Sequence, residues 1–166
     1  MDLSVFKNKR ILITGHTGFK GSWLTIWLLG TGAQLSGYAL PPKTERDNYS
    51  LSGISHKINE HIADIRDKEK VFNVFKEENP EIVFHLAAQP LVLDSYNEPL
   101  YTIETNTIGT ANVLEAFRLS DSAKLLIVVT TDKVYENYEL ERGYKENDRL
   151  GGKDPYSASK ASAEIL

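Results

Sequence analysis

The chain has 166 residues, 41% of them hydrophobic, and a formal net charge of −4, which fits one globular domain rather than a disordered chain. The mildly acidic balance excludes the basic footprint of nucleic-acid or anionic-membrane binding proteins. Without cysteine there is no disulfide framework and no thiolate metal site. The sequence shows no signal peptide and no apolar stretch long enough to span a bilayer, so we expect a cytoplasmic protein.

Short apolar runs alternate with helix-spaced segments along the chain. Strands are expected at 10–15, 33–40, 57–64, 81–88 and 123–131, and helices at 18–30, 67–80, 99–119 and 155–166. Polar loops are expected over 41–53 and 132–153. This order predicts an α/β fold of the Rossmann type, a doubly wound parallel sheet with helices on both faces. Such a sheet usually has a sixth strand, so we expect the C-terminal part of a longer protein to be missing.

Apolar side chains at helical spacing indicate which helix faces are buried. The residues assigned to the core on this basis are Trp23, Trp27, Val71, Phe75, Ile108, Ala111, Leu114 and Phe117. The last strand, "AKLLIVVTT", is apolar throughout, as in strands that are covered on both faces.

A glycine-rich loop, "TGHTGFKG", joins the first strand to the first helix. Gly15 suits a tight turn, Gly18 lets the backbone approach a diphosphate, and Gly21 lets helix and strand pack closely. The helix N-terminus then faces the phosphates with free N–H groups. The alternative is a plain turn between strand and helix. The loop residues assigned to dinucleotide binding are Gly15, Thr17, Gly18, Phe19, Lys20 and Gly21.

The acid that commonly binds the ribose of NAD is absent from the end of the second strand, "GYALPPK". Lys43 and Arg46, in the following loop, are candidates for binding a 2′-phosphate, so NAD and NADP both remain open. Asp64, followed by Ile65, ends the third strand and is placed to meet an adenine edge. A turn or helix cap is the alternative role of Asp64.

Tyr156 and Lys160 are four residues apart on the last helix and therefore share a face. A tyrosine with a reference pKa near 10 is a poor base unless its anion is stabilised. A lysine ammonium and the positive nicotinamide ring of NAD would supply that stabilisation. Thr131, at the end of the fifth strand, adds a hydroxyl that can bind a substrate alcohol. This set removes a proton from an alcohol while NAD accepts its hydride.

Five motifs together resemble the extended short-chain dehydrogenase/reductases, and more narrowly the nucleotide-sugar 4,6-dehydratases. They are "TGHTGFKG", "ADIRD", "HLAAQP", "VVTTDKVYEN" and "DPYSASK". Within that family the match is closest to the branch that acts on CDP-glucose. The resemblance covers nearly all of the chain and about half of a typical member. It implies that residues 1–166 are the NAD-binding Rossmann portion, that the substrate-binding part lies outside this chain, and that this portion alone is inactive.

The resemblance implies a reaction in three stages. The sugar is oxidised at C4 with Tyr156 as base, water is lost across C5 and C6, and the hydride returns to C6. Asp132 corresponds to the acid that protonates the departing hydroxyl. Lys133 stands where dTDP-glucose relatives carry glutamate, which leaves the C5 base unassigned. The products of this family serve deoxysugar biosynthesis, including that of lipopolysaccharide O-antigen.

The resemblance also implies which residues line the cofactor cleft and which helices form an interface between subunits. It assigns the end of the fourth strand and the next residue to the cleft, namely Leu86, Ala87, Ala88 and Gln89, whereas His85 is interpreted as a core histidine. The helices at 100–119 and 155–166 resemble a pair that forms a homo-oligomer interface, although packing on their own sheet would need the same pattern. No metal is expected.

Two rival functions remain open. Another extended reductase, such as a 4-epimerase, shares the Tyr–Lys pair but needs no acid for water loss, so Asp132 and Lys133 favour the dehydratase. A non-catalytic dinucleotide-binding module tends to keep the glycine loop and lose the Tyr–Lys pair, and this chain has both.

Overall fold

The computed structural model describes residues 3–139 and 141–166. The chain divides into two compact units, one formed by the residues up to Ala87 with Asn112–Val129, the other by Ala88–Ala111 with Thr130–Leu166. The first contains the sheet and the glycine loop. The second contains the helix with Tyr156 and Lys160. The expectation that residues 1–166 form one NAD-binding portion stays a prediction.

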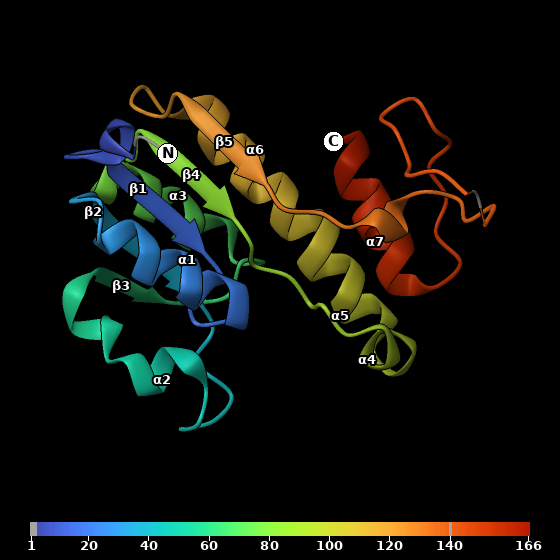
Figure 1. The fold of residues 1–166 in the computed structure, drawn as a ribbon, viewed down its shortest axis with the longest axis horizontal. Coiled ribbons are helices and arrows are strands. Elements are labelled where there is room, and N and C mark those ends of the chain that lie inside the picture. Colours follow the sequence, from blue (N-terminus) through green and yellow to red (C-terminus); the bar gives the residue numbers. More distant parts are fainter. Residues whose placement is uncertain (1–2, 140) are drawn as a thin grey trace. The chain divides into compact units, whose positions relative to one another are not determined.

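The first unit is built on a five-stranded sheet in the order β3-β2-β1-β4-β5 (Figure 1). Its strands are β1 (Arg10–Thr14), β2 (Gln34–Ala39), β3 (Asn59–Ile62), β4 (Ile82–His85) and β5 (Leu125–Val128). Every neighbouring pair is parallel. The order reverses direction at β1, which is the topology of a doubly wound sheet and confirms the predicted Rossmann-type fold.

Both faces of the sheet are buried, as side-chain alternation along β1 makes clear. Leu12 belongs to a cluster with Val83, Phe75 and Val113, which come from β4 and two helices. Its neighbour Ile11 belongs to a second cluster with helix residue Leu28. Because successive side chains of a strand point to opposite faces, these are separate cores on the two sides of the sheet.

Strand β5, at one end of the sheet, is less buried than its apolar sequence suggested. Leu125 and Ile127 of β5 are exposed, whereas β1 is buried over four of its five residues. A strand at the end of a sheet lacks a neighbour on one side, so it is less well covered than a central strand. The strand itself was predicted, but its full burial was wrong.

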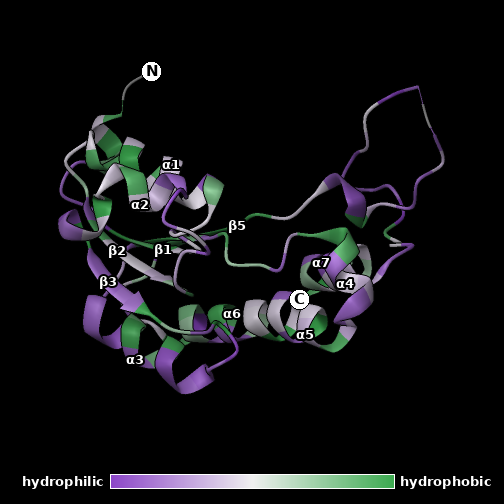
Figure 2. Cartoon of the chain, turned by 90° about the horizontal axis from the view of Figure 1, so that it is seen from below, coloured by the Kyte–Doolittle hydropathy of each residue, from purple (hydrophilic) through white to green (hydrophobic). Residues whose placement is uncertain are grey.

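Clear local signals in the sequence define one helix of the first unit. In α3 (Lys68–Glu78) the Asp67 side chain caps the N-terminus by accepting from the N–H of Lys70, and Asn79 ends the helix in the left-handed conformation. Val71 and Phe75 are buried as predicted, while the exposed lysines and glutamates make most of α3 hydrophilic (Figure 2).

Helix α1 (Phe19–Leu29) buries a different face from the one expected. Ser22, Thr25 and Leu28 are buried, whereas Trp23 and Trp27 are 53% and 49% exposed. Small side chains allow the helix to approach the sheet closely, and this turns the bulky indoles outward. Assigning the tryptophans to the core was therefore wrong.

The segment expected as a polar loop at 41–53 contains a short helix, α2 (Asn48–Ser52), followed by the 3-10 helix η2 (Ile54–Lys57). Asp47 organises the turn before α2, because its carboxylate accepts from the N–H groups of Lys43 and Thr44. Tyr49 of this helix is buried. The helix was not predicted because the segment is rich in residues that are typical of turns.

The helical stretch expected at 99–119 consists of α5 (Pro99–Ile103), the π-helix η3 (Glu104–Ile108) and α6 (Gly109–Leu119). Its fully buried row includes Asn106, Thr110, Val113 and Ala116. Of the predicted row, Phe117 packs against the core and Ala111 and Leu114 are partly buried, but Ile108 is exposed. Steps of three residues drift around a helix of 3.6 residues per turn, and the π-helical segment shifts the phase further.

The second unit gathers α4 (Val92–Asn97), α5, η3, the 3-10 helix η4 (Asp132–Val134) and α7 (Pro155–Ile165). Helix α7 starts where predicted, with Pro155 in its first turn and Asp154 accepting from the N–H of Ser157. A further 3-10 helix, η1 (Ser4–Phe6), precedes the sheet of the first unit. Across residues 3–139 and 141–166, the structure contains no helix with the length and apolar character needed to cross a membrane.

Candidate active site

The glycine loop is fixed by two close backbone approaches in the first unit. Gly15 has φ +76°, and a Cβ there would lie 2.7 Å from the N of Ala87. A Cβ on Gly21 would lie 2.0 Å from the carbonyl oxygen of Gly15. Side chains at these two positions would push the loop away from β4 and from α1, so the residues present fit the tight phosphate-binding turn predicted from the sequence.

The N-terminus of α1 is open toward solvent. Its N-cap, Gly18, makes no side-chain capping hydrogen bond, and Phe19 and Lys20 are exposed. Thr17 instead points inward, where its Oγ1 donates to the carbonyl oxygen of Leu40 at 2.9 Å. First-turn N–H groups without a side-chain acceptor can receive the oxygens of a diphosphate.

Thr14 is a residue of this loop whose role sequence reasoning missed. Its Oγ1 lies 2.7 Å from Nδ1 of His85 and accepts from the N–H groups of Leu86 and Ala87, both at 3.2 Å. One hydroxyl therefore ties the end of β1 to the segment that follows β4. The burial of His85 against it agrees with the interpretation of a core histidine. A threonine ending an apolar strand was the available signal.

His16 was also missed. Its ring is fully buried, and Nε2 lies 2.9 Å from Oε1 of Glu60 on β3. A Cβ on Gly37 would lie 2.6 Å from the ring, so the glycine in β2 makes room for it. Burial lowers the pKa of His16 despite the nearby carboxylate, which keeps the imidazole neutral at neutral pH. The glycine inside an apolar strand was the signal for this close approach.

Asp64 lies just after β3, where it was expected. Its carboxylate is engaged by the Arg66 guanidinium at 2.7 Å, and this hydrogen bond lowers the pKa of Asp64. The carboxylate also accepts from the N–H of Arg66 at 2.9 Å, as in the turn considered as its alternative role, whereas the cap of α3 is Asp67. Ile65 is buried in the core, and its backbone carbonyl oxygen accepts from the Asn112 side chain at 3.1 Å. Adenine binding by Asp64 and Ile65 stays a prediction.

The segment Leu86–Gln89 continues from β4. Leu86 and Ala87 pack at the edges of the two cores, and Ala88 is partly buried. The Gln89 side chain is committed inside the second unit, where it donates to Thr102 Oγ1 at 3.0 Å and accepts from the N–H of Leu91 at 2.6 Å. The place of Gln89 in the cofactor cleft stays a prediction.

Asn106, on the π-helix, joins this segment to α7 within the second unit and was not singled out from the sequence. Its side chain accepts from the N–H of Gln89 at 2.8 Å and donates to the carbonyl oxygen of Gln89 at 3.1 Å. It also donates to Ser159 Oγ at 2.9 Å. An amide in the middle of a largely apolar helix was the sequence signal.

The predicted catalytic residues Thr131, Asp132 and Tyr156 lie together in the second unit. Thr131 Oγ1 donates to Asp132 Oδ1 at 3.1 Å, and the Thr131 side chain is near enough to Tyr156 to lower the pKa of its phenol. Burial raises the pKa of Tyr156, and the charges of Asp132 and Asp154 act in the same direction, against the lowering effect of Thr131. Lys133 follows on η4 with an exposed side chain.

Lys160 is 3% exposed on the buried side of α7. Burial lowers its pKa, and the charge of Glu164 raises it. Lysine side chains are rarely buried unless they are paired with another polar or charged group. The position one turn from Tyr156 is the one that the sequence predicted.

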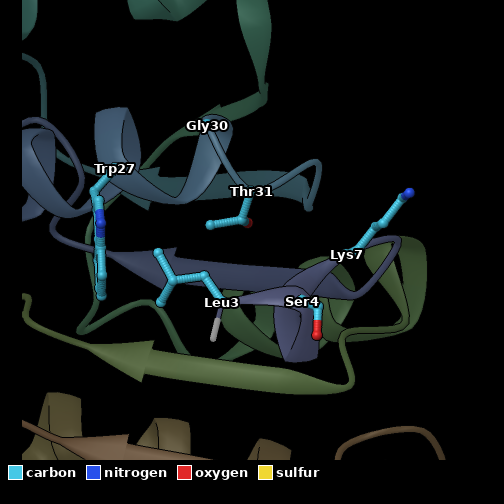
Figure 3. A pocket seen from close by; sticks show the side chains of 6 residues that line it. All are labelled: Leu3, Ser4, Lys7, Trp27, Gly30 and Thr31. Atoms are coloured by element: carbon cyan, nitrogen blue, oxygen red, sulfur yellow. The ribbon is translucent and has the colours of Figure 1, made fainter. Parts of the chain in front are cut away.

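A separate hollow in the first unit lies at the opposite end of α1 from the glycine loop (Figure 3). It is lined by Leu3, Ser4, Lys7, Trp27, Gly30 and Thr31. It contains none of the predicted site residues.

The sequence from residue 12 to residue 166 matches the model of the GDP-mannose 4,6-dehydratase family. The chain belongs to this family. Among curated members and relatives, it is 46% identical to the CDP-glucose 4,6-dehydratase of Salmonella typhimurium, over all of this chain and 46% of that protein. It is 32% identical to the UDP-glucose 4-epimerase of Mycolicibacterium smegmatis, over 94% of this chain and 49% of that protein.

Solved structures agree with the family assignment. The UDP-glucose 4-epimerase of Thermus thermophilus, in complex with NAD, superposes with a TM-score of 0.81 at 33% identity. The alignment covers 94% of this chain and 49% of that one. The chain thus spans about half the length of the relatives that it matches.

Proposed function

We propose that the protein is an NAD-dependent nucleotide-sugar 4,6-dehydratase and that its substrate is CDP-glucose. This proposal rests on the position of Asp132. Its carboxylate accepts a hydrogen bond from the Thr131 hydroxyl, and Tyr156 lies in the same group of residues. Oxidation of an alcohol needs only a base and a hydride acceptor, whereas elimination of water also needs an acid beside the bound substrate. The 46% identity to a CDP-glucose 4,6-dehydratase supports the choice of substrate.

The glycine loop is assigned to the diphosphate of NAD. The close approaches at Gly15 and Gly21 and the open first turn of α1 support this assignment. When bound, NAD accepts and returns the hydride, and its positive ring favours the phenolate form of Tyr156. NAD rather than NADP is supported by the NAD complex of the Thermus epimerase.

We assign each proton transfer of the reaction except the one at C5 to a residue of the second unit. Tyr156 takes the proton of the C4 hydroxyl, Thr131 binds that hydroxyl, and Lys160 supplies positive charge one helical turn from the phenol. Water is then lost across C5 and C6: a base that we leave unassigned removes the C5 proton, and protonated Asp132 donates its proton to the C6 hydroxyl as it leaves. Lys133, adjacent to Asp132, completes the proposed set.

A second candidate is a nucleotide-sugar 4-epimerase, because several similar structures and relatives carry that name. It would use Tyr156, Lys160 and Thr131 in the same way and leave Asp132 without a role. A non-catalytic dinucleotide-binding protein would need none of these residues, and their association in one group argues against it.

The test is a substrate panel with the full-length protein. The protein is incubated with NAD and, in turn, CDP-, dTDP-, GDP- and UDP-glucose, and each product is identified by NMR and by its absorbance in alkali. We expect a 4-keto-6-deoxy sugar from CDP-glucose in preference to the others. An epimer would establish the second candidate, and preference for another nucleotide would overturn the assignment of CDP-glucose.

A further inference from the structure

Glu164 extends the row begun by Tyr156 and Lys160 by one more helical turn. The three residues lie four apart on α7, and side chains with this spacing share one helix face. Glu164, which is exposed on the last turn of α7, therefore follows the proposed base and its lysine along one helix face.

The Glu164 carboxylate is held in place from outside its own helix. Thr130 Oγ1 donates a hydrogen bond to Glu164 Oε1. Thr130 is the residue before Thr131, whose side chain acts on the pKa of Tyr156. The same two-residue segment thus bonds to the carboxylate at one end of the row and lies near the base at the other.

Lys160, between them, has little access to water because it is only 3% exposed. A buried ammonium tends to lose its proton unless an opposite charge lies nearby. Burial lowers the pKa of Lys160, and the charge of Glu164 counteracts that effect. An uncharged lysine would no longer favour the anion of a neighbouring phenol.

We propose that Glu164, anchored by Thr130, is a positioning residue that keeps the buried Lys160 charged. The proposal deepens the proposed function and rests on it for its catalytic consequence. The effect on Lys160 itself does not depend on which substrate is used.

Other ionisable groups near α7 have to be considered in the same test. The elements packed against it are α4, α5, η3 and η4. Their ionisable side chains are Asp94, Tyr96, Tyr101, Glu104, Asp132 and Lys133, and the adjoining loop adds Tyr135 and Asp154. Glu164 differs from them in combining the i+4 position relative to Lys160 with an anchor on Thr130.

The first measurement is the titration of Lys160 in the full-length protein without substrate. Lysine labelled with carbon-13 at Cε is followed by NMR across alkaline pH, and Lys160→Arg identifies the signal. In Glu164→Gln, which keeps an acceptor for Thr130 but removes the charge, we expect the midpoint to move to lower pH. Glu141→Gln, an exposed acid in the second unit, is the matched control and should leave the midpoint unchanged.

The second measurement is the steady-state rate as a function of pH. Glu164→Gln should lower kcat by about tenfold, less than the roughly 10²–10⁴-fold effect of a group that transfers the proton itself. The KM for the nucleotide sugar should not change, and the alkaline limb of the profile should move to lower pH. Thr130→Val should have a smaller effect of the same kind, and Thr130→Ser should restore wild-type behaviour.

An unchanged Lys160 titration in Glu164→Gln would overturn the proposal, whatever the kinetics show. A shifted titration with no change in kcat would confine Glu164 to stabilising the charge and would contradict its part in catalysis. Failure of the proposed function would be recognised separately, because the substrate panel would then give no dehydrated product with the wild-type protein.

Discussion

The surroundings of Tyr156 work against its proposed role until positive charge is supplied. Burial and two nearby carboxylates raise its pKa, and the Thr131 hydrogen bond offsets them only in part. A phenol in this setting stays protonated at neutral pH. In the proposed mechanism Lys160 and the positive ring of NAD supply that positive charge, so we expect the strength of Tyr156 as a base to depend on bound cofactor.

Asp132 provides the sharpest residue-scale test of dehydration. In Asp132→Asn the side chain still accepts from Thr131 but has no acidic proton to give to the departing hydroxyl. We expect elimination to slow by about 10²–10⁴-fold while oxidation at C4 slows much less. Rapid-quench analysis of the sugar together with the near-ultraviolet absorbance of reduced nicotinamide separates the two steps.

The matched control for that variant is Asp94→Asn, since Asp94 is an exposed acid on α4 of the same unit. It should leave both steps unchanged. Slow oxidation with normal elimination in Asp132→Asn would count against the role of Asp132 as the acid.

At the scale of elements, the π-helix η3 places a single amide where three hydrogen bonds converge. Asn106 pairs with both backbone groups of Gln89 and with Ser159 on α7. A π-helical turn inside a helix is uncommon and often marks a functional segment. Here it positions the chain that follows β4 and the helix that carries Tyr156.

Asn106→Leu keeps a similar volume but removes these bonds. Leaving a buried polar group unpaired costs about 1–3 kcal/mol, so we expect the free energy of unfolding to fall by at least that amount. Urea denaturation of the full-length protein measures the change. Asn97→Leu, at an exposed position on α4, is the control; equal losses in the two variants would show that the Asn106 bonds are not important for stability.

The sequence predicted the order of strands and helices well, because apolar runs and caps such as Asp67 and Asp154 are local signals. It did not predict which helix faces are buried. Trp23 and Trp27 are outward because Ser22 and Thr25 pack on the sheet, and polar Asn106 is buried because its partners are distant in sequence. The role of His16 likewise depends on Gly37 and Glu60, which no local pattern connects to the loop.

At the scale of the whole molecule, we propose that the protein is a homo-oligomer through the helices at 100–119 and 155–166. Large apolar side chains on the second unit support this, since Leu100 on α5 and Ile165 on α7 are 75% and 74% exposed. Isolated exposed leucines are ordinary, but several on adjacent helices are typical of an interface.

Replacing both with glutamate, Leu100→Glu with Ile165→Glu, should convert the full-length oligomer to a monomer, because buried unpaired carboxylates strongly disfavour association. Sedimentation velocity measures the change. Leu51→Glu is the control, because Leu51 is 74% exposed on α2 of the first unit. An unchanged oligomer in the double variant would place the interface elsewhere.

The most direct test of the central claim is the turnover of Tyr156→Phe in the full-length protein with NAD and CDP-glucose. The account predicts that turnover, followed by the absorbance of the keto sugar in alkali, falls by at least about 10²-fold, while the dissociation constant for NAD, measured by calorimetry, does not change. Turnover close to that of the wild-type protein would contradict the assignment of Tyr156 as the base.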